Sequence, residues 1–337
     1  MAKGLSCELA KFRELFGREI PSEMAKHVVG AEEFIWMVLL TLLAGSGHRD
    51  EGAPEYHAHI LTEGGVGTGK TFIFSTIAKT VENSTYNRVQ FTRDLKQLSL
   101  KRTVEQDEDG LIKYSPGPLS ANFVLADEIT RAGDAVHAAL LEAMAEGVLV
   151  TPSKIYQTPR PYMVLATANP RDVTGVVGRL GTAFSDRFVF RIDAPEYTRE
   201  QRVSIMLGQE ERSKEKIRAV LSCEDILKAR DLIHSEVSVD KTTVAVFIEQ
   251  LTRLFADLFK DDQDSSRYGA EGERSALWFV RTAKARAFLF GRSYVILEDV
   301  TKLAYPILRH RISFGFEVPS SEKKSRIEAK ISETLLA

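Results

Sequence analysis

The feature that most constrains this chain is a glycine-rich stretch at residues 60–71, which reads Ile-Leu-Thr-Glu-Gly-Gly-Val-Gly-Thr-Gly-Lys-Thr. It contains the spacing G-x-x-x-x-G-K-[ST], with Gly64, Gly69, Lys70 and Thr71 at the defining positions. Apolar residues precede it and a helical pattern follows it, which is the strand–loop–helix context that the motif requires. The stretch predicts a loop that binds a nucleoside triphosphate.

Each residue type in this loop has a physical task. Glycines let the backbone adopt positive φ and approach phosphate oxygens without a Cβ atom. Successive N–H groups and the N-terminus of the following helix then favour an anion. The Lys70 ammonium can reach the β- and γ-phosphates, and the Thr71 hydroxyl can bind Mg²⁺. The residues expected to bind the nucleotide are Gly64, Gly65, Val66, Gly67, Thr68, Gly69, Lys70, Thr71 and Phe72.

Length and composition are those of a soluble globular protein. The 337 residues can form two ordinary domains with sizeable cores, and 44% hydrophobic with 27% charged residues is an ordinary balance. A formal charge of −2 gives no electrostatic reason to expect nucleic acid or an acidic membrane as a partner. Two distant cysteines, no apolar run long enough for a membrane span and no signal peptide favour a cytoplasmic protein.

Apolar periodicity separates an α/β part of the chain from an all-helical part. Strands predicted at 88–92, 122–126, 162–168 and 188–192 alternate with helices, which predicts a mostly parallel sheet covered on both faces. A hairpin is predicted at 148–159, whereas residues 93–120 are polar and interrupted, with an acidic cluster interpreted as a solvated loop. We expect four parts, namely an N-terminal helical segment (1–27), a nucleotide-binding α/β domain (28–195), a helical lid domain (196–312) and a C-terminal tail (313–337).

A second candidate element is the acidic pair Asp127–Glu128, which follows the apolar strand 122–126. At the carboxyl end of a sheet, Asp127 can hold Mg²⁺ through water and Glu128 can polarise an attacking water. Asn169 ends another apolar strand, where its amide could orient that water, although a turn before Pro170 explains it equally well. The GTP-specific Asn-Lys-x-Asp motif is absent from the sequence, which disfavours a GTPase.

In their order along the chain, these motifs resemble those of the MoxR family of AAA+ ATPases, from about Val28 to Ile312. The resemblance implies an α/β P-loop ATPase domain, with a parallel sheet sandwiched by helices, followed by an all-helical lid. It implies that ATP and Mg²⁺ bind between the ATPase domain and the lid. The matching stretches are Gly64–Thr71, Leu125–Ala132, Ala139–Gly147, Ala166–Pro170, Asp186–Phe188, Gly269–Arg274 and Leu308–Ile312.

The resemblance also implies roles for single residues. Arg187 matches the arginine that similar proteins offer to the γ-phosphate of a neighbouring subunit, and Arg131 is a weaker candidate at that boundary. Arg274 matches a second sensor that reaches the γ-phosphate of its own subunit. The planar, delocalised charge of arginine suits these roles better than lysine would. The implied catalytic residues are Glu128, Asn169, Arg187 and Arg274, and the implied Mg²⁺ contacts are Thr71 and Asp127.

The family resemblance implies a ring, expected to be a hexamer, that remodels or activates a partner protein. In this family the partner often carries a von Willebrand A-type domain, an expectation by analogy alone. Residues 94–118 and 148–159 match insertions that face the pore or the partner in hexameric relatives. Three alternatives stay open, namely a motor stimulated by nucleic acid, a nucleotide-gated assembly scaffold with little turnover, and a small-molecule kinase. The neutral charge balance disfavours the first, the intact acidic pair the second, and the lack of an acceptor site the third.

Overall fold

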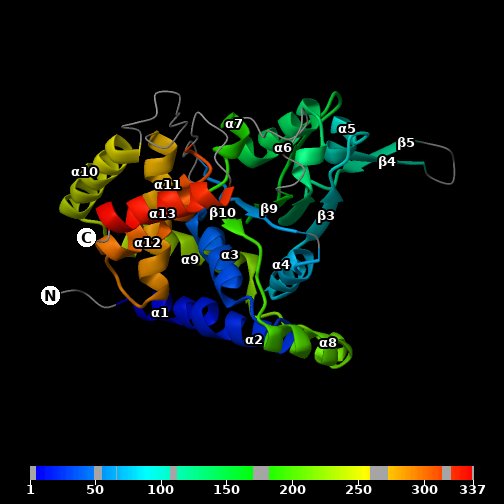
Figure 1. Cartoon of the computed structure of the whole chain (residues 1–337). Helices are drawn as coiled ribbons and strands as arrows, with labels where there is room; N and C mark the ends of the chain where they lie inside the picture. Colours follow the sequence, from blue (N-terminus) through cyan, green and yellow to red (C-terminus); the bar gives the residue numbers. More distant parts are fainter. Residues whose placement is uncertain are drawn as a thin grey trace.

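A five-stranded parallel sheet lies at the centre of the protein, with helices on both faces (Figure 1). The computed structural model describes residues 5–48, 55–65, 67–106, 112–169, 182–258, 272–312 and 320–335. The predicted α/β class with a parallel sheet is confirmed. In spatial order the strands are β10 (Phe190–Asp193), β1 (Ile60–Glu63), β9 (Met163–Ala168), β6 (Phe123–Asp127) and β3 (Tyr86–Gln90).

Alternate residues of the strands enter two separate apolar cores, one on each face of the sheet. Leu125 and Leu165 belong to the first core, whereas Val124 and Ala166 belong to the second. Because both faces are buried, the strands read as continuous apolar runs rather than as an alternating pattern. The first core includes α3 (Glu32–Ala44), α4 (Lys70–Lys79) and the helices of the C-terminal half, and the second includes α6 (Asp134–Glu146).

Two N-terminal helices pack below the sheet in the view of Figure 1, α1 (Cys7–Glu14) and α2 (Ile20–His27). The sequence predicts that Pro21 ends or kinks the first helix. Instead the chain stays helical, through a π-helical turn at Leu15–Glu19. Pro21 is the second residue of α2, which directly follows this π-helical turn.

The C-terminal half is helical, as the sequence predicts. In Figure 1, α10, α11, α12 and α13 gather beside the sheet on the left. Ile327 and Ile331 of the last helix are buried in the first core. No helix in the described part of the chain is both long and apolar enough to cross a membrane. The helices are α8 (Arg199–Lys214), α9 (Cys223–Glu236), α10 (Lys241–Leu258), α11 (Glu273–Leu289), α12 (Leu297–Leu308) and α13 (Ser320–Leu335).

Two β-hairpins extend the α/β part. The hairpin of β7 (Val148–Val150) and β8 (Ile155–Gln157) is the predicted one. A second hairpin, β4 (Arg102–Gln106) with β5 (Ile112–Pro116), follows α5 (Gln97–Lys101) and projects from the body of the protein (Figure 1). It lies where the sequence shows only polar, interrupted chain. A projecting hairpin buries little, so it leaves almost no apolar pattern to detect.

The remaining elements are short. β2 (Val81–Glu82) pairs with β11 (Leu221–Ser222), and α7 (Thr182–Ser185) precedes β10. The boundaries of the four parts of the chain stay a prediction. Of the acidic cluster, Glu105 lies in β4, whereas residues 107–109 lie outside the described residues.

A buried carboxylate fixes α2 to the segment that precedes β11. Glu23 is 2% exposed, and it accepts hydrogen bonds from the Arg218 amide at 2.8 Å and from Nζ of Lys26 at 2.7 Å. Burial alone would raise the pKa of Glu23, but the Arg218 amide, Lys26 and His27 together lower it to about 2. The ionised carboxylate therefore stabilises the fold.

We expect Glu23→Gln to lower the free energy of unfolding by about 2–3 kcal/mol at neutral pH. Because the pKa of Glu23 is lower in the folded state, its contribution is complete above the unfolded value of 4.5 and is lost as pH falls toward 2. Urea denaturation between pH 2 and pH 7 should therefore show the two proteins converging in acid. The exposed Glu14→Gln, which removes only an i,i+4 pair with Arg18, is the control and should change stability by at most about 0.5 kcal/mol. A pH-independent difference for Glu23→Gln would contradict this account.

Candidate functional site

The glycine loop leaves β1 and leads directly into α4. Gly67 and Gly69 have φ values of 83° and 79°, a region that residues with a Cβ atom avoid. Gly64 has a different task, since a Cβ atom there would lie 2.4 Å from Cβ of Ala194, the residue that follows β10. The loop can therefore close onto the neighbouring strand only with glycine at 64. Val66 lies outside the described residues.

The side chain of Lys70 lies along this loop. Its Nζ donates to the carbonyl of Gly65 at 2.8 Å, to that of Gly64 at 3.2 Å and to Oγ1 of Thr68 at 3.0 Å. Burial lowers the pKa of Lys70, while the negative charges of Asp127 and Glu128 raise it. The lysine and both carboxylates therefore act on one another in a single site.

Asp127 ends β6 and both of its carboxylate oxygens are hydrogen-bonded. Oδ1 accepts from the hydroxyl of Thr167 at 2.6 Å, and Oδ2 accepts from Nη2 of Arg88 at 2.6 Å. Thr167 belongs to β9 and Arg88 to β3, the two strands that flank β6 in the sheet. The orientation of the carboxylate is thus set from both sides.

Glu128 has an unusual backbone conformation. Its φ of 57° and ψ of 46° are left-handed, which costs a residue other than glycine about 1–3 kcal/mol. Its amide donates to Oγ1 of Thr167 at 2.8 Å, and its carboxylate oxygen Oε2 accepts from Gln90 at 2.6 Å and pairs with Arg131 at 2.6 Å. These contacts fix the residue in the strained conformation, which is a common property of functional sites.

Asn169 and Thr71 lie at the same edge of the sheet. Asn169 follows β9, whose last carbonyl, that of Ala168, accepts from the amide of Gly64 at 3.3 Å. Thr71 is the second residue of α4. Because β1, β6 and β9 are parallel neighbours, their carboxyl ends meet at one edge. The structure therefore brings the loop, Thr71, the acidic pair and Asn169 together.

Arg187 and Arg274 lie together at the amino-terminal ends of the strands, which is the edge opposite the one that carries the glycine loop. Arg187 comes three residues before β10, which runs parallel to β1 with Phe190 opposite Ile60. The four residues of β10 alone span about 10 Å toward the edge where the glycine loop begins. Arg274 forms an ion pair with Asp186, next to Arg187 in the chain.

The expected contact of Arg274 with the phosphates of its own subunit stays a prediction. The pKa of Arg187 is lowered by burial and then by the positive charge of Arg274, so the two guanidinium groups act on each other. Nε of Arg187 is buried and has no hydrogen-bond partner among the described residues. The ion pair with Asp186 holds Arg274 near the amino-terminal end of β10.

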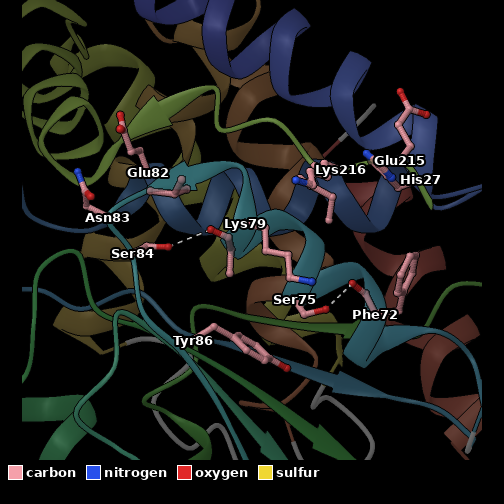
Figure 2. Close-up of a pocket in the computed structure, with 13 residues that line it drawn as sticks. His27, Phe72, Ser75, Lys79, Glu82, Asn83, Ser84, Tyr86, Glu215 and Lys216 are labelled. Atoms are coloured by element: carbon pink, nitrogen blue, oxygen red, sulfur yellow. Dashed lines mark hydrogen bonds between the residues drawn. The ribbon is translucent and has the colours of Figure 1, made fainter. Parts of the chain in front are cut away.

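A hollow of about 730 Å³ lies along the outer side of α4 (Figure 2). It runs from Phe72 at the start of the helix to Ser84 and Tyr86 beyond its end, and residues 215–217 close one side. Phe72 is half exposed and is the one expected nucleotide-binding residue that lines the hollow. The hollow therefore meets the glycine-loop site only at its edge.

Sequence reasoning missed several residues that contact the site. Thr167 could have been found, because it lies two residues before Asn169 and so on the same face of the strand. Gln90 could not, since its place opposite Asp127 depends on the pairing of β3 with β6. Tyr197, whose hydroxyl donates to the carbonyl of Thr68 at 3.1 Å, has no signal in the sequence.

The groups at this edge suit a nucleoside triphosphate with Mg²⁺. The loop offers backbone N–H groups and an ammonium for phosphate, and the edge offers a carboxylate and a hydroxyl for the cation. The described residues contain no group of three histidine, cysteine or acidic side chains that could hold a metal ion unaided. A carboxylate and a hydroxyl at this edge fit Mg²⁺, which usually binds one or two protein oxygens together with phosphate oxygens and water.

Comparisons with known proteins agree with this geometry. Residues 59–190 match the model of the ATPase family associated with various cellular activities (AAA), and residues 260–334 match the AAA lid domain. The family resemblance in the sequence was expected to end at Ile312, but the lid match extends past that residue. It includes α13, which packs against α10 and α12.

Individual relatives cover nearly the whole chain. Chaperone MoxR1 of Mycobacterium tuberculosis is 30% identical over 331 residues, which are 95% of this chain and 80% of the relative. Protein MoxR of Methylorubrum extorquens is 28% identical over 86% of this chain and 85% of its own length. The crystal structure of a Cytophaga hutchinsonii protein superposes with a TM-score of 0.81 at 30% identity and covers 97% of this chain and 96% of that one.

We expect Lys70→Ala to weaken binding of a fluorescent ATP analogue by about 10- to 100-fold, the value of one charged hydrogen-bonding group. Lys79→Ala, at the exposed far end of the same helix, is the control and should bind like the wild type. Circular dichroism should show equal helix content in all three proteins. Equal affinity of Lys70→Ala and Lys79→Ala would show that the ammonium does not contact phosphate.

Proposed function

We propose that this chain, which belongs to the MoxR family of AAA+ ATPases, hydrolyses ATP with Mg²⁺ in a ring of identical subunits. The ring uses the hydrolysis to remodel or activate a partner protein in the cytoplasm. The observation that carries the proposal is the division of the candidate groups between two edges of the sheet. Lys70 and the acidic pair lie at one edge, and Arg187 with Arg274 lies at the other.

At the carboxyl edge, each group has a separate task in phosphoryl transfer to water. The N–H groups of the loop and the Lys70 ammonium bind the phosphates, and Asn169 contacts the γ-phosphate or the attacking water. Glu128 accepts a hydrogen bond from that water and so orients it. Thr71 and Asp127 would hold Mg²⁺, which would supply positive charge that neutralises the phosphate oxygens.

At the amino-terminal edge, the two arginines need the nucleotide of another subunit. A phosphate bound at the carboxyl edge is separated from Arg187 by the length of β10, about 10 Å, which favours a contact with the nucleotide of a neighbouring subunit. Head-to-tail contacts that place one edge against the other form a ring when the rotation between successive subunits closes. Membership of the family supports a ring, and we expect a hexamer.

A partner protein is supported by a named relative and by one exposed apolar surface. The relative from M. tuberculosis is named a chaperone. On the β4–β5 hairpin, Val104 lies opposite Tyr114, and both share one face with Ile112. These side chains are between 44% and 61% exposed, which is unusual for large apolar residues and typical of contact surfaces. A von Willebrand A-type domain in the partner remains an expectation from the family.

If each ATPase site is shared between two subunits of a ring, the ATPase activity must depend on subunit association. The rate per subunit should rise cooperatively with protein concentration, and Arg187→Ala should lower the maximal rate on the order of 10³-fold, as expected for an arginine at the γ-phosphate. Arg253→Ala, an exposed arginine of α10, is the matched control and should keep the wild-type rate. A rate per subunit that is independent of concentration and of Arg187 would exclude a shared site.

Mixed rings test whether Arg274 acts across the boundary between subunits. Arg274→Ala and Glu128→Gln should each be nearly inactive alone. If Arg274 acts on the neighbour's nucleotide, mixing them restores activity, because some sites combine an intact Glu128 with an intact Arg274 from the next subunit. The same recovery is expected for Arg187→Ala mixed with Glu128→Gln. If Arg274 acts within its own subunit, only the mixture that contains Arg187→Ala recovers.

A further inference from the structure

One side chain of β9 makes two hydrogen bonds in opposite directions at the centre of the site. The hydroxyl of Thr167 donates to Oδ1 of Asp127 at 2.6 Å and accepts from the amide of Glu128 at 2.8 Å. Thr167 is 3% exposed. A hydroxyl has one donor and two acceptor positions, so a single oxygen can make both bonds. No aliphatic side chain of the same shape could make either.

The two bonds act on different parts of the acidic pair. The bond to Asp127 fixes the rotation of its carboxylate, whose other oxygen is held by Arg88. The bond from the Glu128 amide satisfies a backbone donor that the left-handed conformation directs toward β9. Oδ2 accepts from both Nε and Nη2 of Arg88, whereas Oδ1 accepts only from Thr167 among the described residues and has a second lone pair, so Asp127 can still accept from water bound to a cation.

We propose that Thr167 is a positioning residue, whose hydroxyl holds Asp127 and Glu128 in the arrangement needed for hydrolysis. The inference rests on the proposed ATPase function. It also connects the acidic pair to Asn169, which lies two residues further along and on the same side of β9. A displacement of this strand at Asn169 therefore reaches the carboxylate of Asp127 and the backbone of Glu128 through one oxygen atom.

The chain offers a matched control for this hydroxyl. Thr62 of β1 lies directly opposite Thr167 in the sheet and is fully buried. Its Oγ1 has no hydrogen-bond partner among the described residues. Thr167→Val and Thr62→Val thus remove the same atom from neighbouring buried positions, and only the first loses the bonds to the acidic pair. Thr167→Ser retains the hydroxyl and should retain the function.

Three measurements separate positioning from a purely structural role. Thr167→Val should lower kcat on the order of 10- to 100-fold, the usual effect of removing a group that orients a metal-binding residue. It should leave the dissociation constant of ATP measured without Mg²⁺ unchanged. It should also raise the Mg²⁺ concentration needed for half-maximal binding of a non-hydrolysable ATP analogue. Thr62→Val and Thr167→Ser should match the wild type in all three measurements.

The outcomes are distinguishable. If the wild type hydrolyses ATP and the two variants Thr167→Val and Thr62→Val have the same kcat and the same Mg²⁺ dependence, this inference is overturned. The proposed function is not overturned by that result. A wild type that neither binds nor hydrolyses ATP would overturn the proposed function, and this inference with it. If Thr167→Val is not folded at the assay temperature, Thr167→Cys replaces it, because a thiol is a weak donor and acceptor of similar size. The cysteine variant should lie between the wild type and complete loss, and full wild-type kcat in it would overturn the inference.

Discussion

The parallel pairing of β1, β9 and β6 is the constraint on which the site depends. Parallel strands in register end at the same edge, so residues separated by more than 100 positions in the chain become neighbours there. Hydrogen bonds between adjacent strands then complete the arrangement, above all the two at the Thr167 hydroxyl, which donates to Asp127 and accepts from the amide of Glu128. The glycine loop adds its own requirement at Gly64, where close approach to Ala194 leaves no room for a Cβ atom.

The same strand direction separates the arginines from the loop. β10 begins at the edge where Arg187 lies and ends beside Glu63, so one short strand connects the two functional edges. Asp186 binds Arg274, and it also accepts from Nε of the buried Arg311 at 2.9 Å. One carboxylate thus fixes two arginines from different parts of the helical half, α11 and the end of α12. Burial lowers the pKa of Arg311, and the charge and hydrogen bond of Asp186 oppose that effect in part.

Much of the fold could be predicted because the relevant signals are local. The loop motif, the apolar strands and the helical periodicity of the C-terminal half each occupy a short window, and the structure contains the corresponding elements. The β4–β5 hairpin was not predicted, because strands that bury little carry no apolar pattern. The contact between Gln90 and Glu128 could not be predicted either, since it exists only after β3 pairs with β6. The association of Arg274 with Asp186 is likewise tertiary, and a motif match assigns a role to Arg274 without giving its location.

The end of α12 connects the helical half to both edges at once. Arg309 donates to Glu63 at 3.1 Å and to Asp193 at 3.0 Å, and these carboxylates end β1 and β10 beside the glycine loop. Two residues later, Arg311 bonds Asp186 and the carbonyl of Phe188 at the opposite end of β10. A movement of α12 therefore acts on the loop through Arg309 and on the arginine pair through Arg311. In the proposed ring those two groups would belong to different nucleotide sites, and α12 would then connect neighbouring sites mechanically.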